Sequence, residues 1–118
     1  MHTHHGIDYV ELTVSDMQAA RTFYAAAFGW EFNDYGPEYS GIKGAAGKEQ
    51  GGLNQVATYK GVRGGPLIIL FSKDLDDTVK KVQSAGGTIV TPQFEFPGGR
   101  RFHFTDPSGN ELAVWSEK

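Results

Sequence analysis

The sequence predicts an α+β protein made of two halves that share one order of elements: a strand, a helix and three further strands. Three observations support this fold class. Short segments alternate between polar and apolar residues, two longer segments repeat apolar residues at helical spacing, and the same order occurs twice within 118 residues. Each half alone buries too little apolar surface to be stable, so the two halves are expected to pair.

The first half begins with a strand over residues 7–14. Its residues alternate, so one face is apolar and is expected to pack on the core, while the other face carries Tyr9 and Glu11. Ser15, with Gln18 three residues later, forms a capping-box pattern that predicts a helix start, and Gly29 predicts its end. Further strands are expected over 30–32, 39–42 and 51–59, with a turn or mobile loop over 45–50.

The second half follows a glycine-rich segment over 60–66, which is the best candidate linker in the chain. The run over 67–71 is apolar on both faces, and this predicts a strand covered on both sides. Asp74 and Asp77 predict the cap of a second helix. A strand over 88–90, another between Pro92 and Pro97 and one over 100–105 are expected to follow.

The chain is organised around the turn at 106–110 and the strand that follows it. Proline presets a turn dihedral, the aspartate can bond to its own backbone, and glycine accepts a positive φ, so Asp-Pro-Ser-Gly predicts a hairpin turn. Alternation after the turn places Leu112 and Val114 on one face. The opposite face then carries a carboxylate and an indole, from Glu111 and Trp115.

Composition narrows the classes of function. A net charge of −3 gives no indication of binding to nucleic acid or to an acidic membrane surface. The absence of cysteine excludes disulfides, cysteine–zinc sites and thiol nucleophiles. No apolar run is long enough to span a bilayer, and the first six residues do not look like a signal peptide, so a cytoplasmic location is expected.

The chain resembles the vicinal oxygen chelate superfamily, which includes glyoxalase I, bleomycin-resistance proteins and extradiol dioxygenases. The residues that carry this resemblance are Val10-Glu11-Leu12-Thr13-Val14-Ser15-Asp16-Met17 with Phe23-Tyr24, Ala85-Gly86-Gly87, and Asp106-Pro107-Ser108-Gly109-Asn110. The resemblance implies two βαβββ modules that form an open, cup-shaped mixed sheet with helices on its convex side, and it implies a homodimer. The expected organisation is a disordered tail over 1–6, a first module over 7–59, a linker over 60–66 and a second module over 67–118.

Metal-dependent members of this superfamily carry His, Glu or Gln ligands on the first and last strands of each module. Carried over to this chain, those positions fall on Tyr9, on Leu67 or Ile68, on Gln55 and on Ala113. Only Gln55 is an ordinary ligand, whereas a divalent first-row metal in such a site needs about three protein ligands. We therefore expect no catalytic metal and no cofactor, while a divalent metal stays possible if other residues supply the ligands.

The cup is expected to contain several polar and aromatic side chains. Glu11 or Glu111 is expected to pair with Arg101, with His103 in the same network, because charges in a partly buried cup need partners. Ligand recognition by these groups and a Glu-His-Glu metal cluster are the alternatives. The candidate ligand-binding residues are Tyr9, Glu11, Gln55, Arg101, His103, Glu111 and Trp115.

The functional hypothesis from the sequence is that the protein binds a small organic ligand in this cup without a catalytic metal. Tyr9 and Trp115 would supply apolar contact, and the other candidates would supply polar recognition. One alternative is a metal-dependent glyoxalase-like lyase or isomerase, or a relative of the dioxygenases. Another is a protein-interaction module with an apolar patch around Trp30, Phe94 and Phe96.

Overall fold

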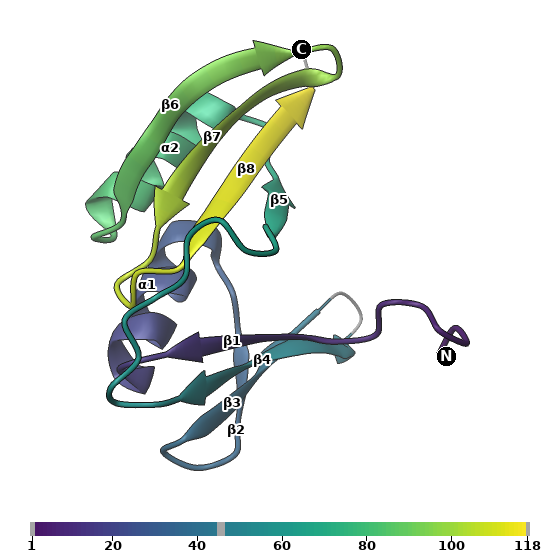
Figure 1. The fold of residues 1–118 in the computed structure, drawn as a ribbon, viewed down its shortest axis with the longest axis vertical. Coiled ribbons are helices and arrows are strands. Elements are labelled where there is room, and N and C mark those ends of the chain that lie inside the picture. The colour runs from purple at the N-terminus through teal and green to yellow at the C-terminus, as the bar shows by residue number, and fades with distance from the viewer. Residues whose placement is uncertain (1, 45–46, 118) are drawn as a thin grey trace.

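Two four-stranded sheets and two helices make up the fold, which a computed structural model describes for residues 2–44 and 47–117 (Figure 1). The strand orders are β1-β4-β3-β2 in the first sheet and β5-β8-β7-β6 in the second. The predicted α+β fold class of two βαβββ modules is confirmed. The elements are β1 (Val10–Val14), α1 (Met17–Phe28), β2 (Phe32–Asp34), β3 (Tyr39–Lys43), β4 (Glu49–Gln55), β5 (Ile69–Phe71), α2 (Leu75–Ser84), β6 (Thr88–Phe96), β7 (Gly99–Thr105) and β8 (Glu111–Glu117).

In each sheet, the first strand in chain order pairs with the last one. β1 pairs with β4 and β5 pairs with β8, both in parallel, whereas all other neighbours in the sheets are antiparallel. A parallel pair needs a long crossover, and in each half that connection contains a helix. The repeat inferred from the sequence is thus present in the topology.

One hydrophobic core joins the two halves, and α1 lies at its centre. The ring of Phe23 packs against Phe104 of the second sheet, with ring centroids 5.9 Å apart. Leu12 and Val14 from β1 share this core with Leu112 and Val114 from β8, as the alternation of both strands predicted. The helices therefore cover the apolar faces of both sheets (Figure 1).

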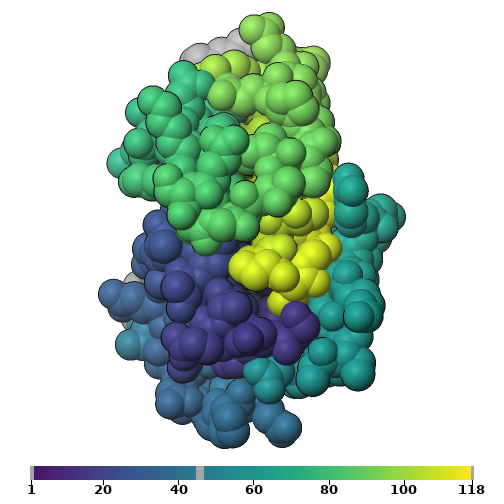
Figure 2. All heavy atoms as spheres, turned by 90° about the vertical axis from the view of Figure 1, so that its left-hand side faces the viewer, coloured from purple at the N-terminus to yellow at the C-terminus, as the bar shows by residue number. Residues whose placement is uncertain are grey.

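Hydrogen bonds made by the turn at 106–110 connect the two halves. The Asp106 carboxylate accepts hydrogen bonds from the Ser108 and Asn110 backbone N–H groups, and Gly109 has a φ of 90°, so the predicted turn is confirmed. The same carboxylate accepts the hydroxyl of Tyr24 on α1 at 2.7 Å, and the Asn110 amide donates to the Thr13 carbonyl of β1 at 2.9 Å. Figure 2 shows the segment after residue 105 in yellow, seated against the purple N-terminal part of the chain.

The start of α1 differs from the prediction by one residue. Asp16, not Ser15, is the N-cap, because its carboxylate accepts the Ala19 N–H at 3.0 Å. The Ser15 N–H instead donates to the Ser108 hydroxyl, which links the helix start to the turn of the second half. The predicted cap of α2 is confirmed, since Asp74 accepts the Asp77 N–H at 3.1 Å.

The apolar run at 67–71 corrects a prediction about burial. Its strand, β5, covers only Ile69–Phe71 and lies at the edge of the second sheet. One face of this strand is open, because Ile69 is 43% and Phe71 51% exposed. The prediction of a strand covered on both sides was wrong, since an apolar composition shows what a surface can bind and not whether this chain covers it.

The other strands match the predictions with shifted bounds. The two strands expected on either side of Pro92 are one strand, β6, which tolerates a proline because it lies at the sheet edge and its pairing with β7 shifts register near that residue. β4 ends at Gln55 rather than at 59. Residues 45 and 46 of the expected loop lie outside the described part of the chain. Neither α1 nor α2 has the length and apolar character that crossing a membrane requires.

Candidate functional site

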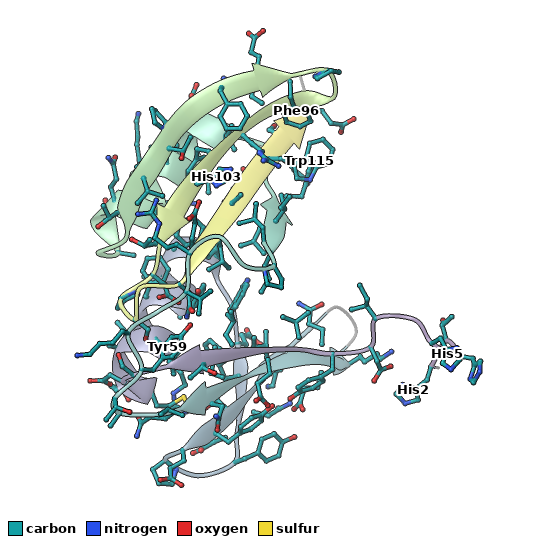
Figure 3. The ribbon with its side chains drawn as sticks, in the orientation of Figure 1. His2, His5, Tyr59, Phe96, His103 and Trp115 are labelled. Carbon is teal, nitrogen blue, oxygen red and sulfur yellow. The ribbon has the colours of Figure 1, made fainter. Side chains whose placement is uncertain are left out.

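The second sheet has a face that points away from the core and carries most of the predicted site residues. We call it the open face. Strand pairing arranges it in two rows across the sheet: one runs from β5 to β6 through Phe71, Trp115, Arg101 and Phe94, and the other through Ile69, Ala113, His103 and Thr91. Figure 3 shows His103, Phe96 and Trp115 along this sheet. Period-two alternation on β7 and β8 thus brings Arg101, His103, Glu111 and Trp115 together.

An apolar hollow of about 390 Å³ lies at one end of the open face. Its lining residues are Ile69, Phe96, Gly98, Arg101 and Trp115. The Trp115 ring lies 5.2 Å from the ring of Phe71 and 6.3 Å from that of Phe96, measured between centroids. This hollow therefore combines the Trp115 indole with neighbouring aromatic rings and one guanidinium. Such a lining can bind a ligand that has a flat apolar group and a polar end.

A second, smaller hollow of about 190 Å³ lies at the other end of the open face, between the 62–67 segment and the side chains of His103 and Glu111. The Glu111 carboxylate lies 2.8 Å from His103 Nδ1 and accepts Arg63 Nε at 3.0 Å. Hydrogen bonds from His103 and then Arg63 lower the pKa of Glu111. The expected pairing of Arg101 with a glutamate is therefore wrong: Glu111 pairs with Arg63 and His103, and Arg101 lies over the ring of Phe94.

The lowered pKa of Glu111 predicts a pH dependence of stability. A carboxyl whose folded pKa lies below its unfolded value stabilises the fold above the unfolded pKa, about 4.3, and this contribution is lost as the pH falls through the folded pKa. We expect Glu111→Gln to destabilise the protein at pH 7 and to do so less at pH 3.5. Urea unfolding at both pH values measures this, with Glu117→Gln, on the exposed end of β8, as the matched control. A loss of stability that is equal at the two pH values would contradict the prediction.

Glu11 lies on β1 of the first sheet and Tyr9 immediately precedes that strand, so both are apart from the open face. The Tyr9 hydroxyl contacts the Tyr39 hydroxyl at 2.6 Å and donates to the Glu49 carboxylate at 3.1 Å. Glu49 also accepts hydrogen bonds from Asn33 and Tyr35, and these donors lower its pKa. Burial raises the pKa of Tyr39, as do hydrogen bonds with Tyr9 and Glu11. A Cβ at Gly52 would lie 2.1 Å from the Tyr39 hydroxyl, so glycine makes room for this cluster.

Gln55 is engaged at the start of α1. Its side-chain oxygen accepts the Met17 N–H at 2.7 Å, which satisfies one of the free backbone donors of the first turn. β4 places it there, because Gln55 pairs with Val14 in the parallel ladder. The apolar patch expected around Trp30, Phe94 and Phe96 does not form one surface. Trp30 stacks on Tyr24 against the core, with ring centroids 4.5 Å apart, whereas Phe94 and Phe96 lie on β6.

Sequence reasoning missed several residues of the open face. Ile69 and Phe71 were assigned to a covered strand, although every second residue of an edge strand can face outward. Phe94 alternates with charged and polar neighbours on β6, and that pattern could have assigned it to the face of Arg101. Arg63 lies in the linker, where no periodic signal predicts its contact with Glu111.

The positions where related metalloenzymes carry ligands do not fit a divalent metal in this chain. The Tyr9 hydroxyl and the Gln55 amide oxygen are engaged in the hydrogen bonds described above, and Ala113 is a buried methyl group. Within residues 2–44 and 47–117, no three His, Cys, Asp or Glu side chains gather as a metal site requires.

A larger hollow of about 530 Å³ lies on another side of the molecule, between the end of α1, β5 and α2. Its polar groups are engaged within the protein. The Ser72 and Thr78 hydroxyls lie 2.7 Å apart, and Lys81 pairs with Asp77 at 3.1 Å. The open face of the second sheet is therefore the better candidate site.

The fold and the pattern of core and turn residues place this chain in a family of known proteins. Residues 6–114 match the family model of the Glyoxalase/Bleomycin resistance protein/Dioxygenase superfamily, and the chain belongs to that superfamily. The resemblance inferred from the sequence is thereby confirmed.

Two curated proteins are similar to this chain in sequence. CFP32 of Mycobacterium tuberculosis, which is named as a candidate glyoxylase, is 30% identical over 125 residues that cover 92% of this chain and 44% of that protein. The anthracycline biosynthesis protein DauV of a Streptomyces species is 28% identical over 115 residues, covering 92% of this chain and 40% of that protein. The chain thus spans less than half the length of these relatives.

Solved structures share the fold at low sequence identity. A glyoxalase-related enzyme from Fulvimarina pelagi has a TM-score of 0.79 and 18% identity, with 96% of this chain and 88% of that chain covered. TnmS3, an antibiotic binding protein from a Streptomyces species, has a TM-score of 0.69 and 18% identity, with 96% of each chain covered. At these identities the structures support the fold alone.

Proposed function

We propose that this protein binds a small organic ligand on the open face of its second sheet, and that it does so without a catalytic metal. The observation that carries this proposal is the apolar hollow of about 390 Å³ lined by Trp115, Phe96 and Ile69, with Arg101 at its edge. Hollows of this size, apolar and with few polar groups, are typical of small-molecule sites. The antibiotic binding protein among the structural neighbours is consistent with such a role.

Binding of an aromatic probe tests this proposal. We expect 1-anilinonaphthalene-8-sulfonate to bind with a Kd in the micromolar range, and we expect Trp115→Leu to weaken it about tenfold, because the indole is the main apolar wall of the hollow. Tyr35→Leu is the matched control, since it removes an exposed ring from the cluster on the first sheet. A fluorescence titration in which Tyr35→Leu weakens binding and Trp115→Leu does not would overturn the assignment to the open face.

The alternative of a metal-dependent lyase, isomerase or dioxygenase makes a different prediction. Elemental analysis after incubation with nickel, zinc, manganese or iron(II) and desalting would then find about one metal ion per chain. The analysis should use protein that lacks residues 1–5, because His2, His4 and His5 could hold a metal adventitiously. We expect no retained metal, since the family's ligand positions do not supply a ligand set.

We also propose that the protein is a cytoplasmic homodimer, as the resemblance implied. β5 lies at the edge of the second sheet and pairs with β8 alone among the described strands, so its free backbone edge supports association with a second copy. Light scattering coupled to size exclusion would give twice the chain mass of 12.9 kDa for a dimer. A single-chain mass at micromolar concentration would contradict this.

A further inference from the structure

We propose that the ligand of the open face carries a carboxylate, and that Arg101 holds this carboxylate. The inference deepens the proposed function and rests on it. It assigns the apolar part of the ligand to the hollow at Trp115 and the anionic end to the neighbouring part of β7.

Arg101 is the first reason to expect an anion. The residue is partly buried on β7, between Phe94 on one side and Trp115 on the other. Its Nε is buried and has no hydrogen-bond partner among the described residues, and none of the ion pairs found there involves Arg101. A guanidinium that has lost part of its hydration is costly unless an anion pairs with it. Since this part of the chain does not supply that anion, a ligand can.

His103 provides a second polar atom without a partner, two residues further along the same face of β7. Its side chain is only 12% exposed, and its Nδ1 donates to the Glu111 carboxylate at 2.8 Å, because a carboxylate only accepts. Its Nε2 is buried and without a partner in the described structure. A polar group of the ligand beside the Arg101 site can satisfy this nitrogen.

The ring of Phe94 covers this part of the face. It lies 5.4 Å from the guanidinium carbon of Arg101 and 6.0 Å from the His103 ring, measured to centroids. Phe94 is 38% exposed and lies on the edge strand β6, whose pairing is irregular between Thr91 and Phe94. Its side chain can therefore turn toward solvent without opening the core. In doing so it would open space beside the Arg101 guanidinium and the His103 ring.

The charges around this position favour one negative group. Arg63, Arg101 and Glu111 are the charged side chains that face His103, from the linker, β7 and β8; the facing residues of β5 and β6 are uncharged. Glu111 and Arg63 neutralise each other, so the uncompensated charge is that of Arg101. A monoanionic carboxylate on a flat apolar body matches both this charge and the adjoining hollow.

A pair of probes of almost equal shape tests the charge requirement. Isothermal titration calorimetry would compare 2-naphthoate with 2-naphthamide at pH 6.5. We expect the carboxylate to bind at least tenfold more tightly, because it gains charge-assisted hydrogen bonds that the amide lacks.

Two variants assign the effect to residues. Arg101→Met should remove the preference for the carboxylate and leave naphthamide affinity within about twofold. Arg100→Met is the matched control, since the neighbouring Arg100 lies outside both hollows of the open face and contacts Gln93 and Asp76, and it should keep the preference.

The outcomes separate the inference from the proposed function. If both probes bind with equal affinity, or if Arg101→Met retains the preference, the inference is overturned while binding at the open face stands. If neither probe binds to the unmodified protein, the proposed function is overturned and the inference with it. A tenfold preference that only the Arg101 variant removes supports both.

Discussion

Replacing Asp106 by alanine is expected to lower the free energy of unfolding by about 3 to 5 kcal/mol. Asp106 is 5% exposed, and its carboxylate accepts hydrogen bonds from the Tyr24 hydroxyl, two backbone N–H groups and the Asn110 amide. Its removal leaves these buried donors without an acceptor, and each unsatisfied group costs about 1–3 kcal/mol, though such costs do not add fully. Urea unfolding followed by circular dichroism would measure the loss.

A matched aspartate variant controls for the change in side chain. Asp76→Ala removes a carboxylate that is exposed on α2 and pairs with Gln93 and Arg100 at the surface, so we expect a cost below about 1 kcal/mol. Tyr24→Phe should cost less than Asp106→Ala, because it removes one donor together with its bond. An Asp106→Ala protein as stable as Asp76→Ala would show that the turn does not fasten the two halves.

The second large effect is expected at Phe23. This buried ring contacts Tyr24 and Phe28 on its own helix and Phe104 on the second sheet. Phe23→Ala should lower the free energy of unfolding by about 3 to 5 kcal/mol, because it leaves a cavity between the halves. Phe71→Ala removes a ring of the same size that is half exposed, and we expect a cost below about 1 kcal/mol.

The shape of the urea unfolding curve tests whether the two halves unfold together. If α1 joins the halves into one cooperative unit, Phe23→Ala shifts the urea midpoint and leaves the slope unchanged. A curve with two separate transitions would mean that one half unfolds while the other persists, and it would contradict the shared core described above.

Alternation predicted more of this protein than any single motif did. Period-two reasoning assigned Glu111 and Trp115 to one face of the last strand, and the pairing of β7 with β8 places Arg101 and His103 on that same face. The turn residues at Asp106 and Gly109 were predictable because each has a specific backbone chemistry. Both kinds of signal depend only on residues that are close in the sequence, and the structure contains both features.

The errors arise where a side chain meets a distant part of the chain. Gln55 looked like a ligand on a strand, but the parallel pairing of β1 with β4 brings it to the start of α1. Arg63 meets Glu111 only because the linker folds back over the second sheet. Such contacts depend on how the elements pack, and a single sequence contains no periodic pattern that reports them.

The position of α1 has a consequence for synthesis on the ribosome. The first half can pair its strands once β4 has left the exit tunnel, yet the rings of Phe23 and Phe28 on α1 pack on Phe104, which is made much later. Until then the nascent chain exposes the face of α1 that carries Phe23, a surface of the kind that chaperones bind. The exposed face of α1 is therefore buried only after the second half has been translated, and the nascent chain is prone to aggregation until then.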